Sequence, residues 1–128
     1  MSRVLIIDDD VSQSALLARL LEANGHEAEC AGNAWAALSC LRHHEPDLVL
    51  LDLSMPWVDG LELLDAIHDE PRFENVRVAI YSGRAEPEAF EAARRLGACD
   101  FIVKGGDGAH TLSRILAHLD AEADAEIQ

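Results

Sequence analysis

The sequence predicts an α/β fold in which one parallel sheet of five strands carries helices on both faces, a doubly wound arrangement. The first observation behind this prediction is that five short apolar runs alternate with five segments of helical periodicity. The second is that strand–helix alternation calls for right-handed crossover connections, which make the strands parallel and place helices on both faces. The 128 residues suffice for one domain with its own core, and they contain no internal repeat or linker.

The chain begins with a strand–helix pair. The first strand is expected over Arg3–Ile7, where apolar residues dominate. Asp10 or Ser12 can cap the helix that follows, and Gly25 ends it after Asn24. Four leucines are expected to form the apolar face of this helix: Leu16, Leu17, Leu20 and Leu21.

The second strand and helix precede a strongly apolar third strand. Glu27–Ala31 alternates polar with small apolar residues, as an edge strand does. Asn33 then caps a helix that Pro46 stops. Four residues of this helix are expected to point inward: Ala34, Ala37, Leu38 and Leu41. The run Leu48–Leu51 is bounded by Pro46 and Pro56, which predicts a short strand buried on both faces.

The next segments continue the alternation. Gly60–Asp69 is expected to be a helix and Pro71–Asn75 a polar connection. Val76–Tyr81 is the fourth predicted strand. Pro87 suits the first turn of a helix that runs to Leu96.

The C-terminal part supplies the last strand and helix. Asp100–Val103 is the fifth predicted strand, and a glycine-rich turn over 105–108 leads into the last helix. Its apolar residues recur at helical spacing: Leu112, Ile115, Leu116 and Leu119. We expect one domain over residues 1–121 and an acidic C-terminal tail over 122–128 that frays.

Charge and hydropathy exclude several classes of protein. The formal net charge is -14, which argues against binding of nucleic acid or of an anionic membrane by this chain. No apolar run approaches the length of a membrane span, and Met1 leads straight into a strand rather than a signal peptide. These features predict a cytoplasmic protein.

The cysteines and histidines show no recognised motif. Cys30, Cys40 and Cys99 are odd in number, and their spacing matches no zinc or redox motif. We expect them to be small, partly buried hydrophobic residues. The six histidines are scattered, and His43 and His44 close a helix, where positive charge suits the helix dipole. We expect all six to be structural or solvated.

Polar residues follow or end four of the predicted strands: Asp8 and Asp9, then Asp52, then Ser82 and Gly83, then Lys104. Parallel strands place these residues at one edge of the sheet, where open α/β sheets bind ligands. Carboxylates crowded at that edge raise one another's pKa unless a cation intervenes. Mg²⁺ fits because it takes hard oxygen ligands, keeps several waters and accepts phosphate oxygens.

These residue types also suit phosphoryl transfer. Asp52 can attack phosphorus and form an aspartyl phosphate. Lys104 can hold one phosphoryl oxygen as a mobile point charge, and the Ser82 hydroxyl can donate to another. Alone, an Asp run before a helix is often only a cap, and a Lys after a strand is often solvated. The agreement of four strand ends is what indicates a site.

Four motifs in order and spacing make the chain resemble the receiver domains of bacterial two-component response regulators: VLIIDDD (4–10), LVLLDLSMPWVDG (48–60), VAIYSG (78–83) and DFIVK (100–104). The resemblance extends from Val4 to about Leu119. It implies a flavodoxin-like fold with strand order 2-1-3-4-5.

The resemblance also implies the chemistry at the strand ends. Asp52 is expected to be phosphorylated by a sensor histidine kinase or a histidine phosphotransfer protein. Asp9 and Asp52 are expected to bind Mg²⁺ directly, and Asp8 through water. The backbone carbonyl of Ser54 would complete the protein's share of the ligands.

Further residues are assigned by the same resemblance. Ser82, Lys104 and the Gly83 amide would hold the phosphoryl group. Phe101 matches the switch aromatic that turns inward when Ser82 moves toward the phosphate, although an ordinary core position explains it equally well.

The chain departs from the family pattern at one position, and two of its other residues occupy positions that vary within the family. Gly105 stands where the family usually has proline, so we expect the Lys104–Gly105 peptide bond to be trans. Ser54 and Arg84 occupy positions that the family varies. Arg84 can either reach a phosphoryl oxygen or point into water.

The implied function is signalling rather than turnover. Activity is expected to be limited to self-phosphorylation from a phosphodonor and self-dephosphorylation. Output would reach a protein target through the face built by the Glu88–Leu96 helix, the fifth strand and the last helix, without nucleic acid or membrane. The chain would be a single-domain regulator of the chemotaxis type or part of a longer one.

Two other functions remain as alternatives. A haloacid-dehalogenase-type phosphatase would use Asp8 as nucleophile and Asp10 as general acid, but no later strand ends in paired acids and Asp52 would have no role. A non-phosphorylated interaction module on the same fold is disfavoured because every chemical residue is present.

Overall fold

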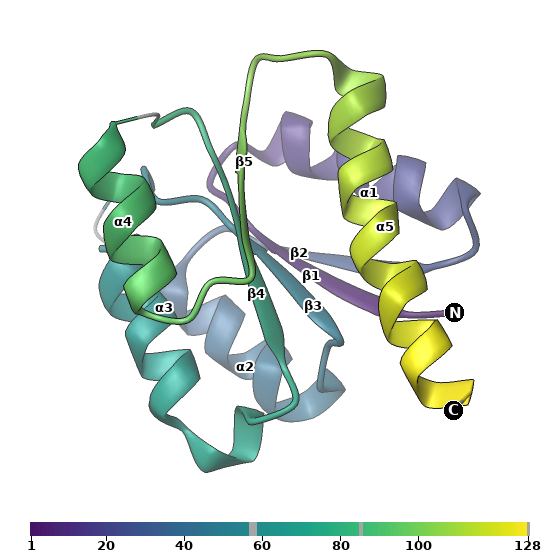
Figure 1. The fold of residues 1–128 in the computed structure, drawn as a ribbon, viewed down its shortest axis with the longest axis horizontal. Helices are drawn as coiled ribbons and strands as arrows, with labels where there is room; N and C mark the ends of the chain where they lie inside the picture. Colours follow the sequence, from purple (N-terminus) through teal and green to yellow (C-terminus); the bar gives the residue numbers. More distant parts are fainter. Residues whose placement is uncertain (57–58, 85, 128) are drawn as a thin grey trace.

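The sheet has the predicted order and direction. The computed structural model describes residues 1–56, 59–84 and 86–127, with side chains described through residue 120. Five parallel strands lie in the order β2-β1-β3-β4-β5 (Figure 1). Their bounds are β1 Arg3–Ile7, β2 Glu27–Ala31, β3 Leu48–Leu51, β4 Arg77–Ser82 and β5 Asp100–Val103. This confirms the flavodoxin-like, doubly wound topology.

Helices cover both faces of the sheet. The helices are α1 Val11–Ala23, α2 Ala34–His44, α3 Gly60–Asp69, α4 Pro87–Arg95 and α5 Gly108–Ile127, with a short 3₁₀ turn, η1, at Pro71–Phe73. Figure 1 shows α1 and α5 on one face and α2, α3 and α4 on the other. None of the helices in the described part of the chain combines the length and apolar character needed to cross a membrane.

Two hydrophobic clusters hold these layers together. Alternate residues of the strands point to opposite faces. Ile7 and Leu51 therefore pack with α2, α3 and α4, whereas Ile6 and Leu50 pack with α1 and α5. The whole of β3 is buried, as its unbroken apolar run predicted. The buried central strands β1 and β3 thus end directly before Asp8 and Asp52.

Side-chain caps fix where the helices begin. Asp10, and not Ser12, caps α1, because its Oδ1 accepts a hydrogen bond of 3.1 Å from the backbone of Gln13. Asn33 caps α2 in the predicted way. Asp59 caps α3 by accepting from two backbone amides of its first turn. The caps at Asp10 and Asp59 both close loops that carry predicted site residues.

Gly60 is required where α3 meets the loop after β3. A Cβ atom at this position would lie 2.7 Å from the Leu53 Cα and 3.1 Å from the Asp52 carbonyl oxygen. Both neighbours are backbone atoms that cannot rotate away. The missing side chain therefore lets the start of α3 press directly on the segment that carries Asp52.

The apolar face of α1 is narrower than predicted. Leu17 and Leu21 are buried, whereas Leu16 and Leu20 are exposed. The prediction that all four leucines share a buried face was therefore wrong for two of them. Successive residues on a helix are about 100° apart, so Leu16 and Leu20 lie beside the stripe that contacts the sheet.

Four segments differ from their predicted boundaries or environment. Helix α4 ends at Arg95, one residue earlier than predicted. The connection expected to be polar contains η1 and buries Phe73 against the core. Strand β4 begins one residue later than predicted and includes Ser82. Residues 122–127 continue α5. The fraying expected there stays a prediction.

The cysteines are more accessible than predicted. All three are free, and Cys40 is half-buried as expected, whereas Cys30 and Cys99 are exposed. Cys30 lies on the edge strand β2, and Cys99 directly precedes β5. Positions at a sheet edge and a strand start receive less cover than the centre of the sheet, which explains the difference.

Candidate functional site

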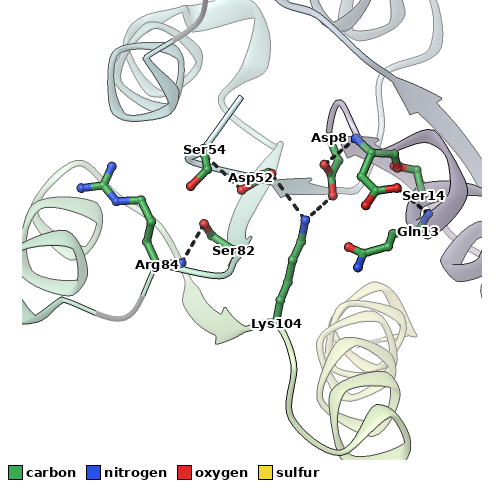
Figure 2. A network of polar contacts seen from close by, with 9 residues as sticks. Asp8, Gln13, Ser14, Asp52, Ser54, Ser82, Arg84 and Lys104 are labelled. Atoms are coloured by element: carbon green, nitrogen blue, oxygen red, sulfur yellow. Dashed lines mark hydrogen bonds and ion pairs between the residues drawn. The ribbon is translucent and has the colours of Figure 1, made fainter. Parts of the chain in front are cut away.

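The carboxyl ends of four strands converge at one edge of the sheet. Ile7 at the end of β1 pairs with Leu51 of β3, so Asp8 and Asp52 follow neighbouring strand ends. Ser82 of β4 pairs with Val103 of β5, the residue before Lys104. Figure 2 shows the side chains of Asp8, Asp52 and Lys104 pointing toward one another. The structure thus brings together the residues that the strand ends predicted.

The Asp52 carboxylate is buried and held by its own loop. Only 6% of the residue is exposed. Its backbone N–H donates to the Ile7 carbonyl oxygen at 2.9 Å. Its Oδ1 accepts from the Ser54 backbone at 3.0 Å, which leaves Oδ2 directed to Lys104 at 3.4 Å (Figure 2). One oxygen is therefore fixed by the turn and the other faces the interior of the site.

Asp8 is still less accessible, with 3% exposed. Its Oδ1 accepts from the Asp10 backbone at 3.0 Å, and its Oδ2 lies 2.5 Å from the Lys104 Nζ. Burial raises the pKa of this carboxyl, and the Asp52 charge adds to that effect, against the opposing contacts from Lys104 and the Asp10 backbone. An ionised Asp8 therefore depends on nearby positive charge.

Lys104 supplies that positive charge. Its side chain is 16% exposed, and Nζ lies 5.3 Å from the centre of the Tyr81 ring as well as between the two carboxylates. Burial alone would lower the pKa of this amine. The hydrogen bond to Asp8 and the charges of Asp52 and Asp8 outweigh burial, so its pKa is raised. The amine is therefore charged at neutral pH.

Three carboxylates at this edge could share a metal ion. Single oxygens of Asp8, Asp9 and Asp52 lie within 4.8 Å of one another. Asp9 is exposed, whereas the other two are buried. An all-oxygen set that is open to solvent on one side suits Mg²⁺, which keeps several of its waters.

Ser82 and Phe101 connect the site to the α4 side of the molecule. Ser82 is fully buried at the end of β4, and its Oγ accepts from the Arg84 backbone at 3.3 Å. Phe101 on β5 is half-buried and packs on Phe90 of α4, with ring centres 4.2 Å apart. Gly83 is exposed, and no atom lies within 4 Å of where its Cβ would be. A side chain at this position would therefore meet no neighbouring atom.

The Arg84 side chain points away from Asp52 (Figure 2). Its guanidinium lies 3.5 Å from the Glu86 carboxylate at the surface. Of the two orientations left open by the sequence, the structure has the one directed outward.

Comparison with known proteins agrees with this geometry. A family model described as the response regulator receiver domain matches residues 4–116. The chain belongs to the response regulator receiver domain family. Phosphorylation on an aspartate is the standard reaction of this family, in two-component signalling.

Individual relatives show how far the likeness of this receiver domain extends. Sporulation initiation phosphotransferase F of Bacillus subtilis is 32% identical over 105 residues, which is 82% of this chain and 83% of that protein. A response regulator receiver domain protein (CheY-like) from Methanospirillum hungatei has a crystal structure that matches with a TM-score of 0.87 and 27% identity, over 98% of both chains.

Other relatives are much longer. A protein-glutamate methylesterase/protein-glutamine glutaminase 3 from Burkholderia thailandensis is 41% identical over 109 residues, which is 81% of this chain but 29% of that protein. The receiver domain therefore spans less than a third of the length of this relative.

Two features of the receiver domain's site were missed by reasoning from the sequence. Tyr81 lies under Lys104, although its apolar neighbours made it look like an ordinary strand residue. Gln13, Leu16 and Leu20 line a hollow of about 200 Å³ beside Gly105 and the loop after it. Both features arise from contacts between segments far apart in the chain, so no local signal predicts the hollow. The alternation of faces along β4 could have shown that Tyr81 and Ser82 point in opposite directions.

Proposed function

We propose that this receiver domain accepts a phosphoryl group on Asp52 from the phosphohistidine of a sensor kinase or a phosphotransfer protein. The observation that supports this most strongly is the placement of the buried Asp52 carboxylate. One of its oxygens is held by the Ser54 backbone, while the other faces Lys104. Among the acidic residues of this edge, Asp52 follows the central, fully buried strand.

The transfer balances in a single displacement. An Asp52 oxygen forms a bond to phosphorus while the bond from phosphorus to the donor's imidazole nitrogen breaks. The electron pair of that bond stays on the nitrogen. Lys104 moves from its contacts with Asp8 and Asp52 to a phosphoryl oxygen, and the Ser82 hydroxyl and the Gly83 amide donate to other phosphoryl oxygens.

The acidic cluster would hold Mg²⁺ during this reaction. Asp9 and Asp52 would bind the ion directly, Asp8 through water, and Ser54 through its backbone carbonyl. The ion supplies positive charge that offsets the repulsion between the carboxylates and an incoming phosphoryl group. The oxygen atoms of Asp8, Asp9 and Asp52 that lie within 4.8 Å of one another support this assignment.

Phosphorylation would alter the face formed by α4, β5 and α5. Ser82 is drawn toward the phosphoryl group and leaves space into which Phe101 turns. Phe101 packs on Phe90 of α4, so a change in its rotamer alters that helix's surface. A downstream protein then distinguishes the two states by contact, without nucleic acid or membrane.

The remaining assignments follow from this role. The domain is a phosphorylated signalling protein, whose chemistry is limited to self-phosphorylation and self-dephosphorylation. Residues 1–121 form the receiver domain, and residues 122–128 form an acidic tail. Its place is the cytoplasm, where phosphohistidine donors would be available to it.

Mapping of the modified aspartate tests this proposal. The protein is incubated with Mg²⁺ and acetyl phosphate, and the acyl phosphate is located by peptide mass spectrometry. We expect the adduct on Asp52. An adduct on Asp8 would favour the phosphatase alternative, and the absence of any adduct would favour the interaction module.

A further inference from the structure

A second group of metal-ligand side chains lies away from Asp52, near the amino end of β1. Cys40 and His44 on α2 and Glu29 on β2 line a hollow of about 240 Å³. Arg3, the first residue of β1, lines the same hollow, whereas Asp8 follows the opposite end of that strand. The group is therefore separate from the aspartate cluster.

Helix and strand periodicity place the three side chains together. Cys40 and His44 are four residues apart, so they lie on the same side of α2. Glu29 shares a strand face with Ala31, which packs in the cluster under α2. The sequence spacing showed no zinc motif because the third group comes from another element.

Glu29 lies between the other two groups. Its Oε1 is 3.5 Å from the His44 Nδ1. Burial raises the pKa of the Cys40 thiol, and the neighbouring Glu29 carboxylate raises it further. The possible ligand atoms of Cys40, His44 and Glu29 lie farther apart than those of Asp8, Asp9 and Asp52. The His44 and Glu29 side chains are 52% and 45% exposed, so both have room to change rotamer.

The surrounding groups favour this set over other combinations. The Arg3 guanidinium is paired with Glu27 at 3.0 Å, which leaves the Glu29 carboxylate for His44 and Cys40. Arg3 also donates to the His44 carbonyl oxygen at 3.1 Å and so ties the end of α2 to β1. The Nδ1 of His43 lies 2.7 Å from the Ser39 carbonyl oxygen, so this ring is bound to its own helix.

We propose that Cys40, His44 and Glu29 bind a transition-metal cation of the Zn²⁺ type, with water in the fourth position. Thiolate, imidazole and carboxylate are the ligands that Zn²⁺ uses, and they select against Mg²⁺. The thiol loses its proton to solvent when the metal binds. The thiolate and carboxylate charges then balance the two charges of the ion. The ion would join the C-terminal part of α2 to the edge strand β2.

Cobalt spectroscopy tests the site in the full-length protein. Co²⁺ is titrated into metal-free protein, and near-ultraviolet thiolate-to-cobalt charge-transfer absorption is recorded. We expect the charge-transfer absorption to appear in the wild type and to be lost in Cys40→Ser. His44→Ala and Glu29→Gln should each weaken binding about ten-fold or more. The aspartate cluster contains no sulfur and cannot produce this absorption.

Matched variants keep the result interpretable. Cys30→Ser, Cys99→Ser and His43→Ala should bind Co²⁺ as the wild type does. Circular dichroism verifies that each variant is folded, and Zn²⁺ should raise the unfolding temperature of the wild type more than that of Cys40→Ser. Absence of the absorption in the wild type, or its persistence in folded Cys40→Ser, would overturn the proposal.

Discussion

At the level of single residues, the central feature of the site is Lys104, which forms ion pairs with two buried carboxylates. Its Nζ lies 2.5 Å from Asp8 and 3.4 Å from Asp52. The longer contact, with Asp52, is the weaker hydrogen bond, so breaking it costs Lys104 less interaction energy than breaking the contact with Asp8. In the proposed transfer, the amine would then move from Asp8 to a phosphoryl oxygen.

Replacement of Asp9 should weaken Mg²⁺ binding. Asp9 is the exposed member of the three-carboxylate cluster, so its loss removes a ligand while the buried core stays intact. We expect Asp9→Ala to lower Mg²⁺ affinity about ten-fold or more in a calorimetric titration. Trp57 is five residues after Asp52 in the sequence and lies outside the described residues; we expect its fluorescence to report Mg²⁺ binding as a second readout. Asp65→Ala, on the exposed side of α3, is the control, and equal affinity in Asp9→Ala and wild type would exclude Asp9 as a ligand.

Away from the site, the Asp100 carboxylate has several hydrogen-bond partners. Its carboxylate accepts from the Arg114 guanidinium and lies 2.8 Å from the His118 Nε2. The His118 Nδ1 faces the Arg77 guanidinium at 2.9 Å. A guanidinium only donates, so Nδ1 accepts and Nε2–H donates to Asp100. Burial alone would raise the pKa of Asp100, but hydrogen bonds from His118 and Arg114 lower it.

Replacement of Asp100 should therefore destabilise the protein in a pH-dependent way. The folded pKa lies below the unfolded value of 3.8, so the stabilisation is present above 3.8 and is lost as the pH falls through the folded pKa. Asp100→Asn should lower the free energy of unfolding by about 1–3 kcal/mol at neutral pH. Urea denaturation at neutral and acidic pH measures this. A difference from wild type that stays constant as the pH falls below 3.8 would contradict the assignment; Asp65→Asn is the control.

At the level of elements, the loop after β3 is fixed by its contact with α3. Gly60 allows this contact, since a Cβ there would meet the backbone of Leu53 and Asp52. We expect Gly60→Ala to cost about 1–3 kcal/mol in unfolding free energy and to slow labelling of Asp52. Gly32→Ala is the matched control, because its Cβ would meet only the Asp8 carbonyl oxygen at 3.9 Å. Unchanged stability and labelling in Gly60→Ala would show that the loop is positioned otherwise.

The loop after β5 lacks the usual proline. The described residues contain no cis peptide bond, which confirms the expected trans Lys104–Gly105 bond, and Gly105 has a φ of 87°. Three glycines among residues 105–108 give this loop many backbone states. Holding Lys104 on a phosphoryl group should therefore cost about 1–2 kcal/mol of entropy per residue that becomes ordered.

Hydrogen exchange measures the ordering of this loop. Amides of residues 106–109 should exchange rapidly in the free protein and slowly with Mg²⁺ and beryllium fluoride, which mimics the phosphoryl group. Amides of the buried strand β3 serve as the reference that stays protected in both states. Equal and strong protection of residues 106–109 in both states would mean that the loop is already ordered, and the entropy argument would fail.

The elements themselves could be predicted from the sequence because their signals are local. The apolar run of β3 and the caps at Asp10 and Asn33 need only neighbouring residues. The exposure of Leu16 could not be predicted, because it depends on which stripe of α1 meets the sheet. The burial of Phe73 depends in the same way on the cluster between the sheet and α3.

At the level of the whole molecule, the sheet brings together residues that are up to 96 positions apart in the chain. The strand order that the resemblance implied was sufficient to predict that Asp8, Asp52 and Lys104 would meet. It could not predict that Lys104 also lies over Tyr81, or that Arg84 points outward, because side-chain rotamers depend on the surrounding contacts. The grouping of Cys40, His44 and Glu29 was missed for a similar reason, since it needs the packing of α2 on β2.

The same arrangement places the proposed phosphoryl site close to the helices beside β5. The carboxyl ends of the strands carry the proposed phosphoryl site, and α4 and α5 lie on opposite faces next to β5 (Figure 1). A change at Ser82 can therefore reach both helices through one strand pair, β4 and β5. With a net charge of -14, the molecule is also suited to meet basic partner surfaces.

The most direct measurement is the initial rate of phosphoryl incorporation into Asp52→Asn, followed by intact mass in Mg²⁺ and acetyl phosphate. Asn cannot form an acyl phosphate, while its size preserves the turn in which Asp52 Oδ1 accepts from the Ser54 backbone. The account predicts no incorporation into Asp52→Asn and full incorporation into the control Asp65→Asn. Labelling of Asp52→Asn at the wild-type rate would contradict the claim that Asp52 is the phosphoacceptor.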